Sequence, residues 1–384
     1  MNRKFRKFSN DIHLWLGLLS GFVLFVVCLS GTIYTFHKEV NEFFNKEKYV
    51  VNASGKQLSA DVLAAGLENS EFKVSHLLIP AGAERSWIFT LKTKTEAAGK
   101  TQGGGKRQQL LVNPYTAQIL GSTDSKTNDF FDVMMKLHRW LLIDQANGRI
   151  VVGISTIIFV LLLISGIILW IPRRWRYWKA AFIVMFSGNW KRINHDLHNT
   201  LGFYTFLLLM VMALTGLCWS FEWYRNGMST VLGDKVFKQR NEKVQPSVYI
   251  PGSAQISFSQ AIAIADQALP FHGNLSVAAP ADSAGSYSIS KTREGFFAVS
   301  MPDKVIIDSY SGEVLKIEKF AEKKFLHQVA AAIRPLHTGE IFGIFSKIIY
   351  FLVCLVATSL PVTGTIIWVN KLRKAPKKKK SIRQ

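Results

Sequence analysis

Four long runs of apolar residues decide the class of this 384-residue chain. They contain no Asp, Glu, Lys or Arg and lie at Leu14–Phe36, Ile150–Ile171, Leu201–Phe221 and Ile348–Val369. A helix of about 20 apolar residues crosses a hydrocarbon core of about 30 Å, because each residue adds about 1.5 Å. Every run is long enough, so the sequence predicts a membrane protein with a four-helix transmembrane bundle.

The first run follows the basic segment MNRKFRK, as the apolar core of a signal peptide does. It is longer than a usual signal core of roughly 7 to 15 residues, and no small-residue cleavage site follows it. We therefore expect the first run to be an uncleaved span.

Clusters of basic residues flank the four runs, and all of these clusters lie on one side of the membrane if the spans alternate. They occur before the first and third runs and after the second and fourth, in MNRKFRK, PRRWRYWK, Lys191–Arg192 and NKLRKAPKKKKSIRQ. Lys and Arg near span ends mark the cytoplasmic side, so we expect both termini there. Part of the net charge of +21 therefore comes from segments that set the orientation of the spans. Such segments contact anionic lipid rather than nucleic acid.

The three cysteines, Cys28, Cys218 and Cys354, all lie inside the apolar runs. The long segments between the runs contain none, which excludes a disulfide framework there. The chain also lacks a CxxCH sequence, which excludes ordinary covalent attachment of a c-type haem.

The two long external segments, 38–137 and 222–336, resemble each other. The first contains QQLLVNPYTAQILGS and the second DKVIIDSYSGEVLKI, each an apolar strand, a polar turn and a second strand. LSADVLAAGL and FSQAIAIADQAL precede them and are amphipathic at helical spacing. Each segment is therefore expected to form a small α+β domain.

The spans repeat as well, so the chain is a duplicated unit of span, external domain and span. DIHLWLGLLSGFVLFVVCLSGTIYTFHKE aligns with DLHNTLGFYTFLLLMVMALTGLCWSFEWY, and KLHRWLL…SGIILW aligns with PLHTGEI…TGTIIW. The two halves keep one orientation, so the repeats are parallel. The matched pairs are His13 with His198, Gly17 with Gly202, Gly31 with Gly216, His138 with His337, Gly166 with Gly364 and Trp170 with Trp368, allowing one gap.

The repeat sorts four histidines into two pairs, one near each membrane face. Pseudo-twofold symmetry would bring His13 to face His198, and His138 to face His337. Two facing imidazoles from different helices are suitable axial ligands for one haem iron. A lone histidine at a span end is usually only an interfacial residue, but ionisable groups at membrane depth are functional candidates. Zinc fits less well, because each pair offers two histidines and no cysteine.

Glycines at fixed offsets from His13 and His198 favour a flat cofactor. Gly17 lies four residues after His13, and Gly31 eighteen residues after it, which is five full turns and the same helix face. Gly202 and Gly216 repeat these offsets from His198, and Gly21 would extend the groove beside His13. Small residues that pack helices together are the alternative explanation.

The other histidines and the tryptophans are less specific. His195 could replace His198 as a ligand, His327 could flank the external pair, and the role of His37 stays open between an interfacial and an external contact. His76 and His272 are expected at the domain surface. Six tryptophans could line an electron path or form an interfacial aromatic belt. They are Trp15, Trp140, Trp170, Trp219, Trp223 and Trp368.

HLWLG…LSGTIY, LHRWLL…GRIVVG…SGIILW, HDLHNTLGF…LTGL and PLHTGEIFG…TGTIIW together resemble the PepSY-associated transmembrane family over essentially the whole chain. The resemblance implies a four-span protein of the bacterial inner membrane with two periplasmic PepSY-like domains. Characterised members include di-haem ferric-siderophore reductases. By that likeness, His13 and His198 would hold a cytoplasmic haem b, and His138 and His337 a periplasmic one.

The expected organisation places cytoplasmic, transmembrane and periplasmic parts in alternation. The N-terminus and first transmembrane helix occupy 1–37, PepSY-like domain one 38–137, helix two 138–171, the cytoplasmic loop 172–197, helix three 198–221, PepSY-like domain two 222–336, helix four 337–369 and the basic tail 370–384.

The resulting hypothesis is an oxidoreductase that passes electrons through two haems to a periplasmic ferric chelate, such as a ferric siderophore, and releases ferrous iron. No GxGxxG fingerprint follows a strand, so the electron donor, a cytoplasmic reductase or quinol, is expected to be separate. Two alternatives stay open: a membrane-tethered PepSY binding or inhibitor module, and a haem relay to another periplasmic acceptor. Spans without Asp or Glu argue against a transporter.

Overall fold

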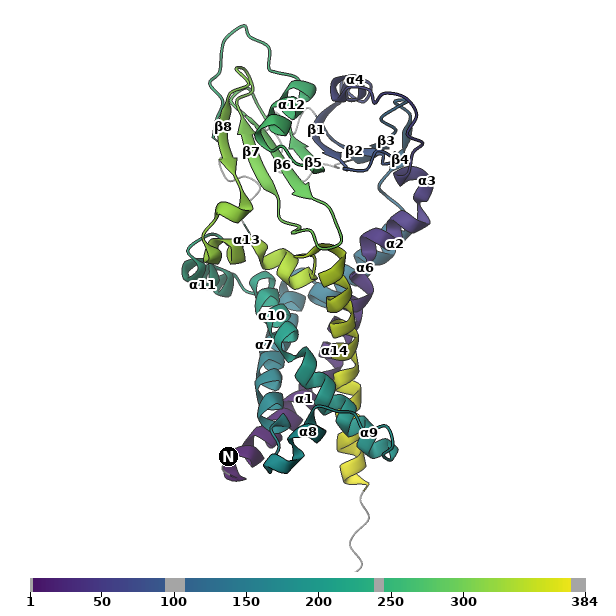
Figure 1. Cartoon of the computed structure of the whole chain (residues 1–384), viewed down its shortest axis with the longest axis vertical. Coiled ribbons are helices and arrows are strands. Elements are labelled where there is room, and N and C mark those ends of the chain that lie inside the picture. Colours follow the sequence, from purple (N-terminus) through teal and green to yellow (C-terminus); the bar gives the residue numbers. More distant parts are fainter. Residues whose placement is uncertain (1–2, 94–107, 238–244, 374–384) are drawn as a thin grey trace, which may run out of the picture.

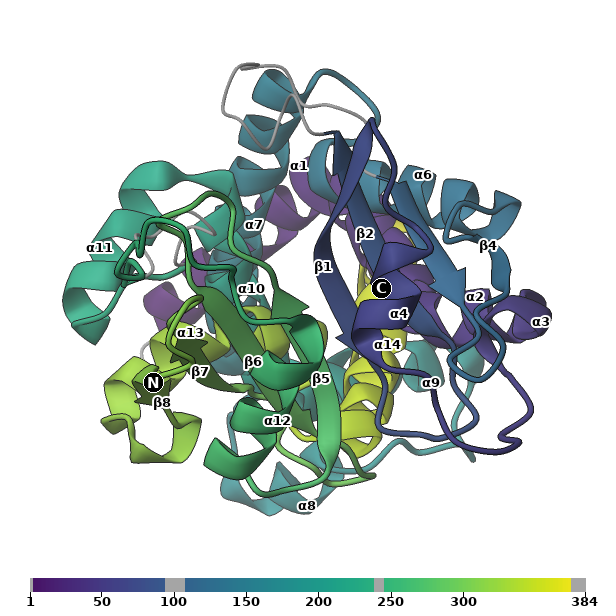
Figure 2. The same cartoon turned by 90° about the horizontal axis from the view of Figure 1, so that it is seen from above.

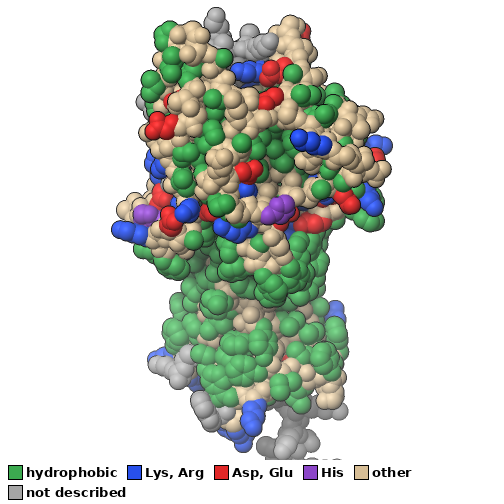
Figure 3. Space-filling model, turned by 45° about the horizontal axis from the view of Figure 1, so that its top comes forward, with side chains coloured by type: hydrophobic (Ala, Val, Ile, Leu, Met, Phe, Trp, Pro, Cys, Tyr) green, Lys and Arg blue, Asp and Glu red, His purple; other side chains and the backbone are tan. Residues whose placement is uncertain are grey.

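A computed structural model describes residues 3–93, 108–237 and 245–373 of the chain. Four long helices pack side by side, and each is long and apolar enough to cross a membrane. They are α1 (Arg3–Tyr34), α7 (Gln145–Trp170), the continuous stretch Trp190–Ser220 and α14 (Gly343–Leu372). On the face shown in Figure 3, hydrophobic side chains form a belt across this bundle, with Lys and Arg at its lower border. The predicted multi-pass membrane protein is confirmed.

The third membrane helix has three parts. They are α9 (Trp190–Asp196), a π-helical turn at Leu197–Leu201 and α10 (Gly202–Ser220). Within the bundle, α1 contacts α7 and α14, and α10 contacts the same two helices. Each half of the repeat therefore packs against the other along the whole bundle, as Figure 1 shows.

An antiparallel sheet of eight strands stands at one end of the bundle (Figure 1). Its first half comprises β1 (Phe72–Ile79), β2 (Trp87–Thr93), β3 (Gln108–Val112) and β4 (Ile119–Ser122). Its second half comprises β5 (Gly273–Ala278), β6 (Tyr287–Arg293), β7 (Asp303–Ile307) and β8 (Val314–Glu318). The strand order is β4-β3-β2-β1-β5-β6-β7-β8, so the two repeated units meet at β1 and β5.

The two α+β units expected from the sequence thus share one sheet and one core. The helices α4 (Ala60–Ala65) and α12 (Phe258–Ala268) contact each other and lie over one sheet face (Figure 2). Asp61 of α4 accepts a hydrogen bond from the backbone N–H of Ser259, at 3.3 Å from Oδ2. Side chains from both units form a single apolar cluster, which includes Leu63, Val74, Leu77, Phe89, Ala261, Val277, Ile289 and Val305.

Short helices connect the sheet to the bundle. In the first half, α2 (His37–Phe44) and α3 (Lys46–Tyr49) lead from α1 to the sheet, and α6 (Lys126–Trp140) returns from β4 to α7. In the second half, α11 (Glu222–Leu232) follows α10, and η3 (Phe320–Glu322) and α13 (Phe325–Thr338) lead from β8 to α14. At the opposite end, η1 (Trp175–Tyr177) and α8 (Trp178–Ala181) lie between α7 and α9.

The helix boundaries differ from the sequence expectation in one respect that matters for the site. His138 and His337 were expected to precede the second and fourth apolar runs and were grouped with those membrane helices. In the structure they lie in the last turns of two separate helices, α6 and α13, and the spans begin at Gln145 and Gly343. Leu141 and Gly339, both with positive φ, terminate α6 and α13 and let the chain turn into the spans. Most of the expected basic tail, 370–384, lies outside the described residues.

Candidate functional site

His13 and His198 face each other at the end of the bundle away from the sheet. We call them the basal pair. Their ring centres are 6.2 Å apart and their planes are nearly perpendicular, at 87°. His13 belongs to α1, and His198 lies in the π-helical turn of the third span. Such π-helical turns are frequent at functional sites, because they displace a side chain from the regular helical position.

His138 and His337 face each other at the end of the bundle next to the sheet. We call them the sheet-side pair. Their ring centres are also 6.2 Å apart, with an angle of 57° between the planes. The structure therefore brings together the two members of each repeat-matched pair, and it keeps the two pairs apart. On α1, the step from His13 to Gly31, on which His138 packs, is about 27 Å at 1.5 Å per residue.

In the basal pair, a hydroxyl group fixes the Nδ1 atom of each ring. His13 Nδ1 lies 2.9 Å from Ser165 Oγ, and His198 Nδ1 lies 2.9 Å from Thr363 Oγ1. Both hydroxyl hydrogens are already donated within their own helices, to Leu161 O at 2.8 Å and to Ser359 O at 3.0 Å. When the hydroxyl hydrogens are donated to these carbonyls, the hydroxyl oxygens accept from the rings and Nδ1 carries the proton.

In the sheet-side pair, a backbone carbonyl lies within hydrogen-bond distance of the Nδ1 atom of each ring. His138 Nδ1 lies 2.8 Å from Val27 O, and His337 Nδ1 lies 2.9 Å from Met212 O. A carbonyl oxygen only accepts, so both Nδ1 atoms are protonated. All four rings thus have an unprotonated Nε2, and no hydrogen bond to it is found within the described residues. This tautomer, with Nδ1–H held by an acceptor, is the one typical of metal-ligating histidine.

Each histidine ring also packs on a glycine of a neighbouring span. A Cβ atom at Gly31 would lie 2.9 Å from His138 Cε1, and one at Gly216 would lie 3.0 Å from His337 Cε1. Larger residues would therefore displace these rings. In the basal pair, a Cβ atom at Gly364 would lie 3.2 Å from His198 Cε1, and one at Gly166 would lie 3.4 Å from His13 Cε1.

This contact changes the interpretation of two glycines. Gly31 and Gly216 were expected to continue the groove beside His13 and His198, but they accommodate the rings of the sheet-side pair instead. The sequence carries a signal for it, because each span contains a Ser or Thr followed by one of the four glycines. The dipeptides are Ser30–Gly31, Ser165–Gly166, Thr215–Gly216 and Thr363–Gly364.

A cavity of about 1400 Å³ surrounds the basal pair. Gly17, Gly21 and Gly202 line it, as expected for a groove beside the two rings. Its walls are largely apolar and come from all four spans, while Lys and Arg gather at its lower end. Of the described residues that line it, seven are Lys or Arg and one, Asp196, is a carboxylate.

The two pairs fit the axial ligation of a haem. A metal–imidazole bond is about 2 Å long and Nε2 lies about 1 Å from its ring centre, so two axial rings have centres about 6 Å apart. Both observed separations, 6.2 Å, match this value. No group of three or more His, Cys, Asp or Glu suited to a metal ion occurs among the described residues. A pair of histidines suffices only where another molecule supplies the remaining ligands, as a porphyrin does.

The remaining histidines lie elsewhere. His195 also lines the cavity, but its side chain is 58% exposed and its Nδ1 faces Asp196 Oδ1 at 3.4 Å, so His198 is the one that faces His13. His37 stacks on Tyr34 at 4.0 Å. His327 lines a separate small pocket beside α11. His76 Nε2 bonds Ser276 Oγ at 2.8 Å, across the junction of β1 and β5.

Some of the tryptophans lie beside the histidine pairs, and others are exposed on the surface. Trp170 and Trp368 line the basal cavity, and Trp170 stacks on Phe203 at 3.8 Å. Trp219 lies 5.1 Å from the ring of His337. Trp15 and Trp223 are about two-thirds exposed, as expected of an aromatic belt.

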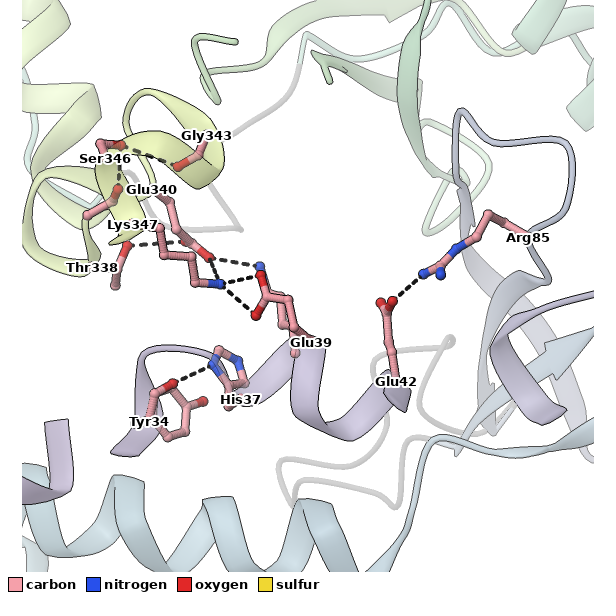
Figure 4. Close-up of polar contacts among 12 residues, drawn as sticks. Tyr34, His37, Glu39, Glu42, Arg85, Thr338, Glu340, Gly343, Ser346 and Lys347 are labelled. Atoms are coloured by element: carbon pink, nitrogen blue, oxygen red, sulfur yellow. Dashed lines mark hydrogen bonds and ion pairs between the residues drawn. The ribbon is translucent and has the colours of Figure 1, made fainter. Parts of the chain in front are cut away.

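A buried lysine ties the sheet-side end of the bundle together (Figure 4). The Lys347 side chain is 4% exposed, and its Nζ lies 2.7 Å and 2.9 Å from the two carboxylate oxygens of Glu39. Glu340 lies 3.8 Å from the same Nζ and 3.2 Å from Lys38 Nζ. Burial opposes the ionisation of Glu340, but Lys38 and Lys347 outweigh it and lower its pKa. The cluster joins α2 to α14 only three residues from His337.

Comparison with known proteins identifies one family. The family model described as "PepSY-associated TM region" matches residues 11–371, which include both histidine pairs and the whole sheet. No curated protein matches the chain.

Proposed function

Since this chain belongs to the PepSY-associated TM region family, we propose that it carries electrons across a membrane through two bis-histidine haem b groups and reduces a ferric chelate. The observation that carries the proposal is the repeated geometry of the two pairs. Each has ring centres 6.2 Å apart, and each ring holds its Nδ1 proton on an acceptor and leaves Nε2 free. One such pair could be a packing accident, but two at opposite ends of a bundle form a relay.

The chain's own residues have defined tasks in this scheme. A bound haem supplies an iron that gains or loses one electron, at a potential set by its ligands and surroundings. His13 and His198 would be the ligands at the basal end, and His138 and His337 those at the sheet-side end. Ser165, Thr363 and the carbonyls of Val27 and Met212 hold the rings in the ligating tautomer.

The proposed orientation places the basal end in the bacterial cytoplasm and the sheet in the periplasm, across the inner membrane. Basic residues at the basal end support it, because Lys and Arg accumulate on the cytoplasmic side of short loops. Within the described residues, Arg3, Lys7, Arg173 and Lys371 all line the basal cavity. Electrons would enter there from a quinol or a separate reductase and leave near the sheet.

The proposed acceptor is a ferric siderophore or another ferric chelate with oxygen ligands. One electron converts ferric to ferrous ion, which hard oxygen chelators hold more weakly, so reduction itself releases the iron. The chain needs no acid–base residue for this step. It must only bring the chelate close to the sheet-side pair.

The proposal is tested by single-turnover reoxidation. Purified protein is reduced with dithionite, freed of excess reductant, and mixed anaerobically with a ferric siderophore and a chromogenic ferrous chelator. We expect the reduced haem bands to be lost together with the appearance of the ferrous complex, at one iron per electron. A His138→Ala variant should keep a reducible basal haem and lose this reaction. Haem that is reoxidised by oxygen but by no ferric chelate would contradict the assigned acceptor and leave a relay to another partner.

A further inference from the structure

Two basic residues occupy matched positions in the basal cavity. Arg173 lies seven residues after Gly166, on which His13 packs, and Lys371 lies seven residues after Gly364, on which His198 packs. A tryptophan stands between them in each half, at the fourth residue after the glycine, namely Trp170 and Trp368. All of these residues line the same cavity. Offsets of four and seven keep residues on one face of a helix, so α14 presents Trp368 and Lys371 below Gly364.

The two cations belong to opposite halves of the repeat. In the first half, α7 ends at Trp170, and Arg173 follows in the turn after Pro172. In the second half, α14 continues to Leu372 and includes Lys371. Seven residues correspond to about 10 Å along a helix, so Lys371 lies below the level of the histidine pair by about that distance. The sequence repeat that matches His13 with His198 also matches these two cations.

Two other basic residues that line the cavity, Arg6 and Arg192, have partners in the protein. Arg6 donates to Leu169 O and Ile171 O, both at 2.6 Å, and so caps the end of α7. Arg192 Nε lies 2.7 Å from the buried carboxylate of Asp196. For Arg173 and Lys371, as for Arg3 and Lys7, no side-chain hydrogen bond or salt bridge is found within the described residues. Arg173 and Lys371 are exposed and line the cavity, so their charges are accessible to a ligand.

We propose that Arg173 and Lys371 bind the two propionate carboxylates of the haem held by the basal pair. This inference rests on the proposed function. A haem b has its two propionates on one edge, on either side of an approximate twofold axis through the iron. A protein whose twofold axis passes between His13 and His198 has one ligand for each face of that ring and one cation for each propionate. His13 and His198 would then hold the iron, and Arg173 and Lys371 would hold the two carboxylates at the basal end of the cavity.

The physical reason for two cations is the cost of placing carboxylates beside an apolar cavity. A buried or partly buried carboxylate needs a charged partner, and a hydrogen bond to a charged group is stronger than one between neutral groups. The guanidinium of Arg173 can bind one carboxylate with two hydrogen bonds, and the ammonium of Lys371 can bind the other as a point charge. Trp170, stacked on Phe203, and Trp368 would wall the apolar part of the ring.

The test compares haem b with its dimethyl ester, in which both carboxylates are uncharged. The full-length protein with His337→Ala, which leaves only the basal pair complete, is prepared without haem and titrated with each compound by the Soret band. We expect it to bind the free acid at least tenfold more tightly than the ester. Adding Arg173→Gln and Lys371→Gln should abolish this preference and leave affinity for the ester unchanged, which also shows that the variant is folded.

The matched control is Arg174→Gln with Lys179→Gln. It removes the same charge from the same end of the bundle, but neither residue lines the cavity, so the preference for the free acid should stay. Equal binding of acid and ester by the protein with both cations would overturn the propionate assignment while leaving bis-histidine haem binding intact. Failure of that protein to bind either compound would instead overturn the proposed function.

Discussion

The basal and sheet-side histidine pairs have the same geometry but are held by different parts of the molecule. In both, the ring centres are 6.2 Å apart and each ring packs on a glycine. The basal rings project from membrane helices and are fixed by side-chain hydroxyls inside a large cavity. The sheet-side rings project from α6 and α13, which are continuous with β4 and β8 through short connections, and are fixed by backbone carbonyls.

The difference indicates which part of the fold each pair depends on. The basal pair needs only the packing of four membrane helices. The sheet-side pair needs in addition that the sheet place α6 and α13 correctly, and the Lys347 cluster anchors the same region. Changes in the extramembrane part should therefore affect the sheet-side pair and leave the basal pair intact.

The largest effect is expected from removing ligands. His13→Ala or His198→Ala should abolish the basal haem and retain the sheet-side haem, because the pairs are separated by most of the bundle. His138→Ala or His337→Ala should do the reverse. Pyridine haemochrome counts would fall from two to one in each variant. Loss of both haems from any single variant, in a protein that still elutes as a folded monodisperse species, would show that the pairs are not independent.

Next in size is the effect of filling the glycine contacts. Gly31→Ala places a Cβ 2.9 Å from His138 Cε1, whereas Gly166→Ala places it 3.4 Å from His13 Cε1. The first change must displace the ring and should weaken sheet-side haem binding at least tenfold. The second should have only a small effect on the basal haem. Gly227→Ala, where no atom lies within 4 Å, is the control. Equal effects of all three changes would mean that these contacts do not position the rings.

Removing hydroxyls should weaken haem binding more at the basal pair than at the sheet-side pair. Ser165→Ala or Thr363→Ala removes the hydroxyl that accepts from Nδ1–H, and the loss of such a partner typically weakens metal binding by roughly 10- to 100-fold. Thr215→Ala should cost much less, although Thr215 Oγ1 lies 3.2 Å from His337 Nδ1, because Met212 O still accepts at 2.9 Å. The rate of haem transfer to an acceptor globin would measure haem binding in the Ser165, Thr363 and Thr215 variants. A larger effect at Thr215 than at Ser165 would refute the distinction.

Lys347→Met should act on the sheet-side end alone. It leaves Glu39 and Glu340 without their buried partner, and Glu340 is three residues from His337. We expect a loss of about 1 to 3 kcal/mol in stability, because Glu39 is partly solvated, with an altered sheet-side haem spectrum and an unchanged basal one. Lys347→Arg should restore much of both. An equal spectral change at both haems would argue against a local anchor.

The smallest expected effect is on the stability of the sheet at low pH. Hydrogen bonds from Lys316, with the charge of Lys323, lower the pKa of Glu318 at the end of β8 to about 2. A depressed folded pKa stabilises the protein above the ordinary value of 4.5, and this contribution is lost as the pH falls toward about 2. After screening by solvent it amounts to about 1 kcal/mol. Glu318→Gln should flatten the acid limb of sheet unfolding, followed by far-UV circular dichroism. An unchanged acid limb would contradict this.

Much of the fold could be predicted from the sequence, because the relevant signals are local or repeated. The four apolar runs predict the spans, and the internal repeat predicts that His13 meets His198 and His138 meets His337. The Ser/Thr–Gly dipeptides can also be found in the sequence, but the sequence does not show which histidine each of them contacts. Ser165 is about 150 residues from His13 in the chain, and only the packed bundle shows that they touch.

Other features depend on contacts that no local pattern encodes. The merging of two α+β units rests on the pairing of His76 to Ile79 with Leu275 to Ala278, between segments about 200 residues apart. The Lys347 cluster was equally hidden, since a single lysine beside an apolar run resembles an ordinary interfacial residue. An internal repeat predicts contacts that occur in both halves. The pairing of β1 with β5 lies at the boundary between the halves, and the Lys347 cluster has no counterpart among the described residues of the other half, so the repeat predicts neither.

The most direct test of the account is the haem content of the purified protein. We would record oxidised and dithionite-reduced spectra in detergent, with a pyridine haemochrome count per chain. The account predicts two b-type haems with low-spin bis-histidine spectra, one lost with His13→Ala and the other with His138→Ala. A protein that binds no haem, even when expressed with added haem, would contradict the central claim and leave the shared sheet as the functional part of the molecule.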